Sequence, residues 1–145
     1  MPANTVYVLN GPNLNLLGTR EPEIYGSDTL DDIAGMLEDR AKELGLEIEM
    51  RQSNHEGHLI DWMHEAQAEE AKAVIINPGA YTHTSIALLD AAKSIRTPVI
   101  EVHLSDPMTR EEFRHVSYIG MAAARSITGQ GPKGYLLALE FAAGL

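Results

Sequence analysis

The chain has 145 residues, of which 44% are hydrophobic, and a formal net charge of -10 at pH 7. This length fits one domain with a core of its own, and the acidic balance argues against nucleic acid, because phosphate binding needs a basic surface. No apolar run is long enough to span a bilayer, so no membrane partner is expected. The lack of cysteine excludes disulfides and thiol chemistry, and it fits the cytoplasm, which is the expected location.

Short apolar runs alternate along the chain with segments of helical period. Strands are predicted at residues 6–9, 46–50, 73–76, 98–102 and 126–128. A helix is predicted from an N-cap at Thr29 to Gly45, and further helices around residues 59–66, from about 84 to 95 and from 134 to 143. The second strand alternates apolar with charged residues, which indicates a place near the sheet edge.

Alternation of strand and helix implies parallel βαβ units with right-handed crossovers. Five strands in this length predict an α/β fold, a flavodoxin-like three-layer sandwich with a parallel sheet in the order 2-1-3-4-5. We expect residues 1–145 to form a single domain. Ligands of such sheets bind outside the carboxyl ends of the strands. Polar residues follow four of the predicted strands: Asn10 and Asn13, Gln52 to Asn54, Asn77, and His103 with Ser105.

The connection after the first strand, residues 10–26, is unusually long for a strand-to-helix loop. It carries Arg20 and Tyr25 between Gly18 and Gly26, two glycines that could serve as hinges. A phenol is a poor base at its ordinary pKa of about 10, and a neighbouring guanidinium lowers that pKa. The segment 18–26 is therefore expected to be a mobile catalytic lid.

Glu101 and His103 lie two apart on a predicted strand, so their side chains share a face. Because the run before Glu101 is apolar, its carboxyl group is expected to be partly buried and to need a partner. We interpret the pair as a carboxylate that orients an imidazole and raises its basicity, although an incidental pairing at the edge of the core is the plainer alternative.

Three further motifs have a plain explanation beside a functional one. Asn77 and His83 flank a Pro-Gly turn that also caps a helix, and they can equally belong to a site. Arg110 and Arg114 either form local ion pairs or neutralise an acidic ligand in a cleft, where a guanidinium binds better than an ammonium. The histidines at 55 and 58 do not match zinc spacings, and we expect no metal.

Together these stretches resemble the type II 3-dehydroquinate dehydratases, from about residue 6 to residue 139. The motifs that carry the resemblance stand in the family's order at residues 9–15, 20–22, 25–26, 52–54, 56–57, 59–61, 77–85, 101–105, 110–115 and 134–135. The resemblance implies a flavodoxin-like subunit in a dodecamer, a tetramer of trimers. It also implies reversible dehydration of 3-dehydroquinate to 3-dehydroshikimate through an enolate, without a cofactor, in the shikimate pathway or in quinate breakdown.

The resemblance further implies a role for each catalytic residue. Tyr25 is the base that removes the proton next to the ketone, and Arg20 lowers the pKa of Tyr25. Asn13 holds a water molecule against the enolate oxygen. His103 protonates the departing hydroxyl group, and Glu101 orients His103.

The same resemblance assigns the residues that bind the substrate. Those placed against its hydroxyl groups are Asn77, His83 and Arg114, and those that receive its carboxylate are Leu104 and Ser105. Arg110 is a further cation that assists Arg20. Asp90 reaches into the site of a neighbouring subunit, and Leu89 beside it departs from the arginine that is frequent there.

Two interpretations without catalysis compete with this one. A flavodoxin-like small-ligand binding module, either flavin-binding or a phospho-receiver, shares the expected fold. A receiver needs acidic residues where this chain has Asn10 and Asn77, and a flavin site needs a Ser/Thr-rich loop where residues 14–17 are mostly leucine. An inactive oligomeric scaffold would not need Arg20, Tyr25 and His103 together.

Overall fold

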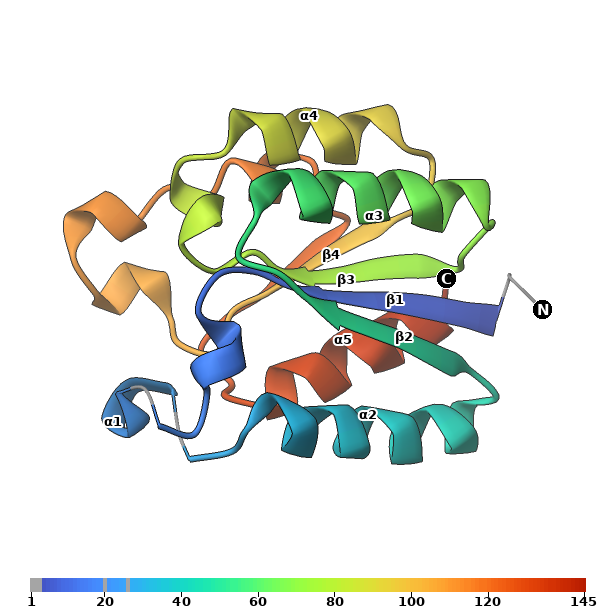
Figure 1. Ribbon diagram of the computed structural model, residues 1–145, viewed down its shortest axis with the longest axis horizontal. Coiled ribbons are helices and arrows are strands. Elements are labelled where there is room, and N and C mark those ends of the chain that lie inside the picture. The colour runs from blue at the N-terminus through green and yellow to red at the C-terminus, as the bar shows by residue number, and fades with distance from the viewer. Residues whose placement is uncertain (1–3, 20, 26) are drawn as a thin grey trace.

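The computed structural model describes residues 4–19, 21–25 and 27–145, apart from the side chain of Tyr25. Five parallel strands form one sheet in the order β2-β1-β3-β4-β5, which confirms the predicted order (Figure 1). The strands are β1 (Thr5–Asn10), β2 (Glu47–Gln52), β3 (Ala73–Asn77), β4 (Val99–Val102) and β5 (Arg125–Ile127). As predicted, β2 lies at an edge of the sheet.

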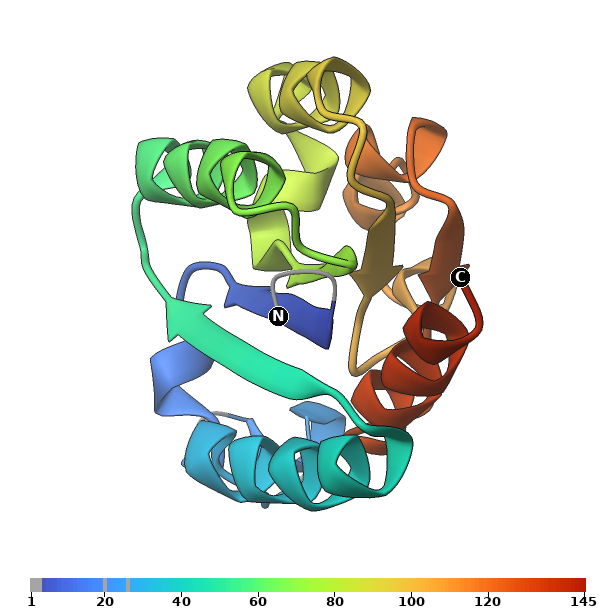
Figure 2. The ribbon, with the colours of Figure 1, turned by 90° about the vertical axis from the view of Figure 1, so that its right-hand side faces the viewer.

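Helices cover both faces of the sheet and give the three layers seen in Figure 2. One face is covered by α3 (Glu56–Ala68) and α4 (Ile86–Ser94), and the other by α2 (Leu30–Leu44) and α5 (Lys133–Ala143). Because side chains alternate along a strand, Val6 and Val8 of β1 join the core beneath α2 and α5, whereas Tyr7 and Leu9 join the core beneath α3 and α4. Within the described ranges, no helix is long and apolar enough to cross a membrane.

Helix α2 begins and ends where the sequence predicts. The Thr29 hydroxyl accepts a hydrogen bond from the Asp32 backbone N–H (3.1 Å), and the Asp32 carboxylate accepts one from the Thr29 backbone N–H (2.9 Å). These reciprocal bonds satisfy two donors at the helix start. Gly45 ends the helix at φ 72°, a left-handed conformation that favours glycine.

The prediction of strict strand-helix alternation is wrong between β4 and β5. This connection contains only three single 3-10 turns, η4 (Pro107–Thr109), η5 (Glu112–Arg114) and η6 (Ile119–Met121). The Asp106 carboxylate caps the start of η4 by accepting from the Met108 backbone N–H (3.0 Å), and Arg110 ends this turn in an extended conformation (φ -109°, ψ -164°). The long connection after β1 likewise holds two short pieces, η2 (Leu14–Leu16) and α1 (Pro22–Tyr25).

A buried polar network joins the carboxyl ends of β1 and β3 to α5. The Tyr135 hydroxyl donates to Asn10 Oδ1 (2.7 Å) and accepts from Asn77 Nδ2 (3.0 Å). Asn10 Nδ2 in turn donates to the Arg51 carbonyl (3.0 Å) at the neighbouring strand. Because Tyr135 is fully buried, these bonds fix both amide groups in one orientation at the point where ligands of such sheets bind.

We expect Tyr135→Phe to lower the free energy of unfolding by about 1–3 kcal/mol, because it leaves polar atoms of Asn10 and Asn77 buried without a partner. Urea denaturation followed by circular dichroism measures the loss. Tyr118→Phe is the matched control, since the Tyr118 hydroxyl has no hydrogen bond to the described residues. Equal stability of wild type and Tyr135→Phe would contradict the importance of the network.

Candidate active site

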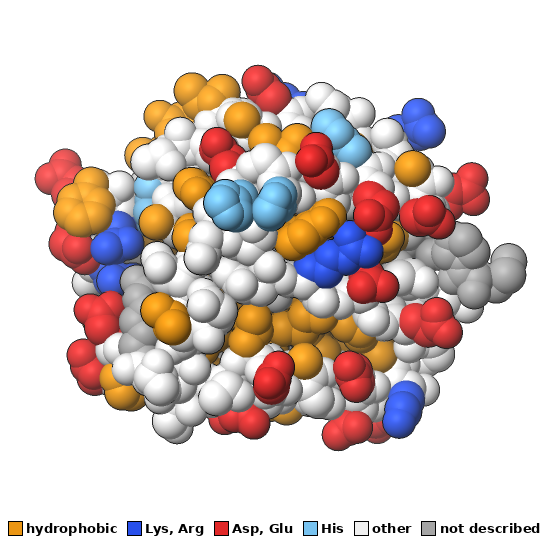
Figure 3. Space-filling model, in the orientation of Figure 1, with side chains coloured by type: hydrophobic (Ala, Val, Ile, Leu, Met, Phe, Trp, Pro, Cys, Tyr) orange, Lys and Arg blue, Asp and Glu red, His pale blue; other side chains and the backbone are white. Residues whose placement is uncertain are grey.

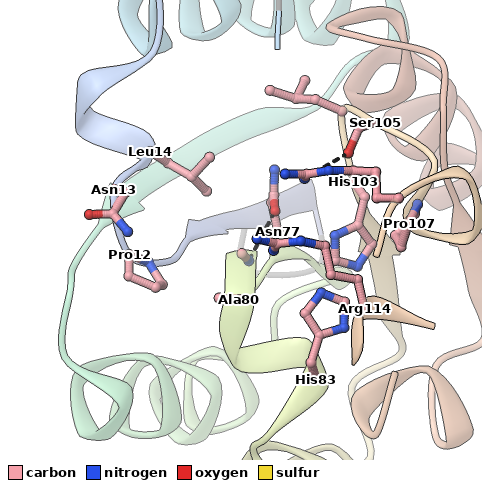
Figure 4. A pocket seen from close by; sticks show the side chains of 13 residues that line it. Pro12, Asn13, Leu14, Asn77, Ala80, His83, His103, Ser105, Pro107 and Arg114 are labelled. Atoms are coloured by element: carbon pink, nitrogen blue, oxygen red, sulfur yellow. Dashed lines mark hydrogen bonds between the residues drawn. The ribbon is translucent and has the colours of Figure 1, made fainter. Parts of the chain in front are cut away.

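A pocket lies at the carboxyl ends of β1, β3 and β4 (Figure 4). Asn13 stands on one side of it and His103 with Ser105 on the other, with Asn77 between them. Eight residues predicted for the site line this pocket: Asn13, Asn77, His83, His103, Leu104, Ser105, Arg110 and Arg114. The structure therefore brings these eight residues together, and their chemical roles stay predictions.

The other four predicted residues are Glu101, Asp90, Arg20 and Tyr25. Glu101 lies behind His103, buried in the subunit. Asp90 is exposed on α4 and does not line the pocket of its own chain. Arg20 lies outside the described residues, and for Tyr25 only the backbone, at the end of α1, is described.

The Glu101 carboxylate is 2% exposed and contacts four side chains. His103 Nε2 donates to Glu101 Oε2 (2.6 Å), and the hydroxyls of Thr82 (2.7 Å) and Ser117 bond to the same oxygen. The Ser126 hydroxyl donates to Oε1 (2.6 Å). Burial alone would raise the pKa of Glu101, but the bond and charge of His103 together with the serine hydroxyls outweigh it and lower the pKa from 4.5 to about 2. Glu101 is thus an ionised carboxylate at neutral pH.

The hydrogen bond to Glu101 defines the proton positions on His103. Nε2 carries the proton that the carboxylate accepts, so Nδ1 is the nitrogen that can gain or lose a proton in exchange with a ligand. The pair can therefore supply a proton to the pocket.

His83 differs from His103 in its surroundings. Its Nδ1 donates to the Val116 carbonyl (2.8 Å), which leaves Nε2 as the remaining ring nitrogen. Burial, and to a smaller degree the positive charges of His103 and Arg114, lower the pKa of His83 below its ordinary value of 6.5. A neutral His83 at physiological pH can accept a hydrogen bond from a ligand hydroxyl.

One end of the pocket is suited to an anion. The backbone N–H groups of Leu104 and Ser105 donate no hydrogen bond within the described ranges, and both residues line the pocket. Arg110 Nη1 reaches the Ser105 hydroxyl (3.5 Å), so a guanidinium stands beside these donors. Arg114, held by both oxygens of Glu111 (3.1 and 3.3 Å), adds a second. Backbone donors and guanidiniums together can bind a carboxylate.

The loop that carries Asn13 is held by hydrogen bonds to Gln52 and Asn54, at and just after the carboxyl end of β2. The Asn13 backbone N–H donates to Asn54 Oδ1 (3.0 Å), and Gln52 Nε2 bonds to Asn54 Oδ1 (3.2 Å) and to the Gly11 carbonyl (3.1 Å). The Tyr81 hydroxyl donates to the Asn54 carbonyl (2.7 Å). This support fixes Asn13 at φ 70°, a conformation that asparagine tolerates.

The sequence predicted polar residues at 52–54 but not what they do. The supporting residues that local patterns did not assign to the site are Asn54, Tyr81, Thr82, Ser117, Ser126 and Tyr135. The available signal was the register of the sheet, since Glu101 and Ser126 are direct neighbours on β4 and β5. Among the described residues, no group of three or more acidic or histidine side chains is arranged to hold a metal.

The lowered pKa of Glu101 predicts an acid-dependent stability. The unfolded chain takes up a proton near pH 4.5 that the folded chain takes up only near pH 2, so the stabilisation is present above about pH 5 and is lost as the pH falls towards 2. The Glu101→Gln variant should lose less stability than wild type across this window, as measured by urea titrations at constant ionic strength. Parallel stability curves for the two proteins would contradict the prediction.

Comparisons with known proteins agree with this geometry. A model of the family Dehydroquinase class II matches residues 4–143. Proteins named 3-dehydroquinate dehydratase from Phenylobacterium zucineum and Caulobacter vibrioides are each 59% identical over 140 residues, which is 97% of this chain and 96% and 95% of theirs.

Solved structures show the same likeness. The crystal structure of a type II dehydroquinase from Propionibacterium acnes has a TM-score of 0.94 at 45% identity, over 98% of this chain and 97% of that one. A 3-dehydroquinate dehydratase-like protein from Bifidobacterium longum has a TM-score of 0.73 at 35% identity, over 97% and 96% of the two chains. The fold, the pocket and these matches lead to one assignment: the chain belongs to the class II dehydroquinase family.

Proposed function

We propose that this chain catalyses the reversible dehydration of 3-dehydroquinate to 3-dehydroshikimate. The observation that carries the proposal is that His103, held from behind by the buried Glu101 carboxylate, lines a pocket that two arginines also line. An elimination of water needs an acid for the departing hydroxyl group, and a substrate with a carboxylate needs cations. The reaction class is that of the named relatives, and it serves either the shikimate pathway or quinate breakdown.

The proposed binding mode follows from the donors in the pocket. The substrate carboxylate lies against the backbone N–H groups of Leu104 and Ser105, beside Arg110. The substrate hydroxyls lie against Asn77, His83 and Arg114, as the family resemblance implies. The fixed orientation of the Asn77 amide supports this placement, since a preset polar group binds without first being ordered.

The proposed chemistry has two proton transfers. Tyr25, with its pKa lowered by Arg20, removes a proton from the carbon next to the ketone, and the electron pair of that bond forms an enolate. A water molecule held by Asn13 stabilises the enolate oxygen. When the ketone re-forms, the carbon–oxygen bond to the hydroxyl breaks, and this oxygen takes the proton of His103 Nδ1 and leaves as water. No cofactor takes part in these steps.

Tyr25→Phe is expected to lower kcat by at least about a thousandfold, while the affinity for the product changes little, because only the base is lost. The conjugated enone of 3-dehydroshikimate gives a direct ultraviolet assay, and calorimetric titration measures product affinity. Tyr118→Phe serves as the control for loss of a phenol elsewhere. A Tyr25→Phe variant with nearly wild-type kcat would exclude Tyr25 as the base, and an inactive wild-type protein would favour the binding module without catalysis.

The chain is also proposed to act as a homo-oligomer, a dodecamer built as a tetramer of trimers. Exposed hydrophobic side chains support a subunit contact on the β4–β5 connection: Met108, Phe113, Val116 and Met121. Ile86 at the start of α4 is also exposed, and Figure 3 shows hydrophobic side chains at this rim of the molecule. Asp90, on the same helix, is exposed and does not line the pocket of its own chain, which fits a contribution to the site of a neighbour.

Light scattering on the purified protein tests the assembly, because one subunit has a mass of 15.9 kDa. We expect a single species with a mass close to that of twelve subunits, and Asp90→Ala to lower activity. An active monomer would contradict both statements. The mobile lid at residues 18–26 and the cytoplasmic location remain predictions from the sequence. Proteolysis during turnover tests the first of these predictions, and cell fractionation tests the second.

A further inference from the structure

We propose that Ser126 is a positioning residue for the reaction, because its hydroxyl holds one oxygen of Glu101 so that the other oxygen faces His103. This inference rests on the proposed function. Ser126 does not line the pocket that holds Asn77 and Arg110, and its side-chain contact with the site is the hydrogen bond to Glu101. On this inference β5, the shortest strand of the sheet, has a role in the site through Ser126.

The orientation of a glutamate carboxylate needs outside support. The last torsion of a glutamate side chain has a broad energy minimum, so the carboxylate plane turns easily unless hydrogen bonds fix both oxygens. Oε2 is held by His103, Thr82 and Ser117. Within the described ranges, the hydrogen bond to Oε1 comes from Ser126 (2.6 Å). Without that bond, one end of the carboxylate loses its restraint.

The register of the sheet places Ser126 where this bond forms. Glu101 of β4 pairs directly with Ser126 of β5 in the parallel ladder, so the two side chains lie on the same face of the sheet. The bond thus spans adjacent strands and depends on the backbone ladder, which is more rigid than a loop. The edge strand β5 thus holds the Glu101 carboxylate of the neighbouring strand β4 in place for its hydrogen bond to His103.

The backbone at Gly120 comes close to Glu101 Oε1. A Cβ atom at Gly120 would lie 2.8 Å from Oε1, so the chain leaves no space there for a side chain. Gly120 and Ser126 both line an open hollow, together with Met108, Met121 and Thr128. Ser126 is itself exposed to solvent on this side. The hollow leaves room for the methyl group of a threonine at position 126.

The mechanism gives the expected kinetic effect. If the carboxylate turns, the His103 ring loses its fixed direction and Nδ1 is misaligned for protonating the departing hydroxyl. This loss acts on the transition state, so kcat falls, whereas the groups proposed to bind the substrate, such as Asn77 and the backbone of Leu104 and Ser105, are unchanged and KM is kept. A merely structural serine would instead change stability and leave kcat unaltered.

The experiment compares steady-state kinetics of the assembled wild-type enzyme with Ser126→Ala, Ser126→Thr and the control Thr128→Ala. Thr128 lines the same hollow and has no hydrogen bond to Glu101 in the described structure. Ser126→Ala is expected to lower kcat about tenfold with KM within about twofold, because a bond to a charged group is lost. Ser126→Thr restores kcat to within about threefold of wild type, and Thr128→Ala leaves it within about twofold.

A double-variant cycle separates positioning from structural support. In a Glu101→Gln background, Ser126→Ala should change kcat less than about twofold, because its target is already altered. A kcat for Ser126→Ala equal to wild type overturns the inference, and so does an equal tenfold loss in both backgrounds. An inactive wild type would instead refute the proposed function, so the two failures are distinguishable.

Discussion

The buried carboxylate of Glu101 constrains the architecture around it. An ionised carboxylate taken out of water costs several kcal/mol unless hydrogen bonds compensate it, about as much as a small domain can lose. Compensation here comes from segments far apart in the sequence: Thr82 from the 3-10 helix η3 (Gly79–His83), Ser117 from the β4–β5 connection and Ser126 from β5. The orientation of the carboxylate that contacts His103 therefore depends on all three segments.

This requirement gives a physical reason for the irregular connection between β4 and β5. A regular helix would present its side chains along one stripe, whereas single 3-10 turns can bring Ser117 to Glu101 and Arg110 and Arg114 to the pocket. The turns leave several hydrophobic side chains in solvent. The subunit contact proposed above would cover these side chains and also keep water away from the neighbouring Glu101–His103 pair.

The ionisable side chains that line the pocket are basic, although the molecule as a whole is acidic. The chain has a net charge of -10, and Asp and Glu side chains outnumber Lys and Arg on the face shown in Figure 3. Arg110, Arg114, His83 and His103 nevertheless converge at one site. Local cations dominate the interaction with a small anion because charges beyond about 10 Å are screened at physiological salt. An acidic protein can thus bind an acidic substrate in a cleft.

The sequence predicted those features that depend on local pattern and on the geometry of parallel sheets. Thr29 and Gly45 carry recognisable cap chemistry, and Asn77 and His103 lie together because the carboxyl ends of parallel strands meet at one edge. The bond between Tyr135 and Asn10 joins residues 125 positions apart, and no local period reveals it. The 3-10 turns after β4 were missed because turns of three residues are too short to carry a periodic apolar stripe.

The proton on His103 Nε2 is the most direct test of this account. Solid-state ¹⁵N NMR of histidine-labelled protein, compared with a His103→Asn variant for assignment, reports which ring nitrogen is protonated when the imidazole is neutral. The account predicts that Nε2 carries the proton and that the Glu101→Gln variant loses this preference. A neutral His103 with its proton on Nδ1 would contradict the claim that Glu101 sets the direction of proton transfer.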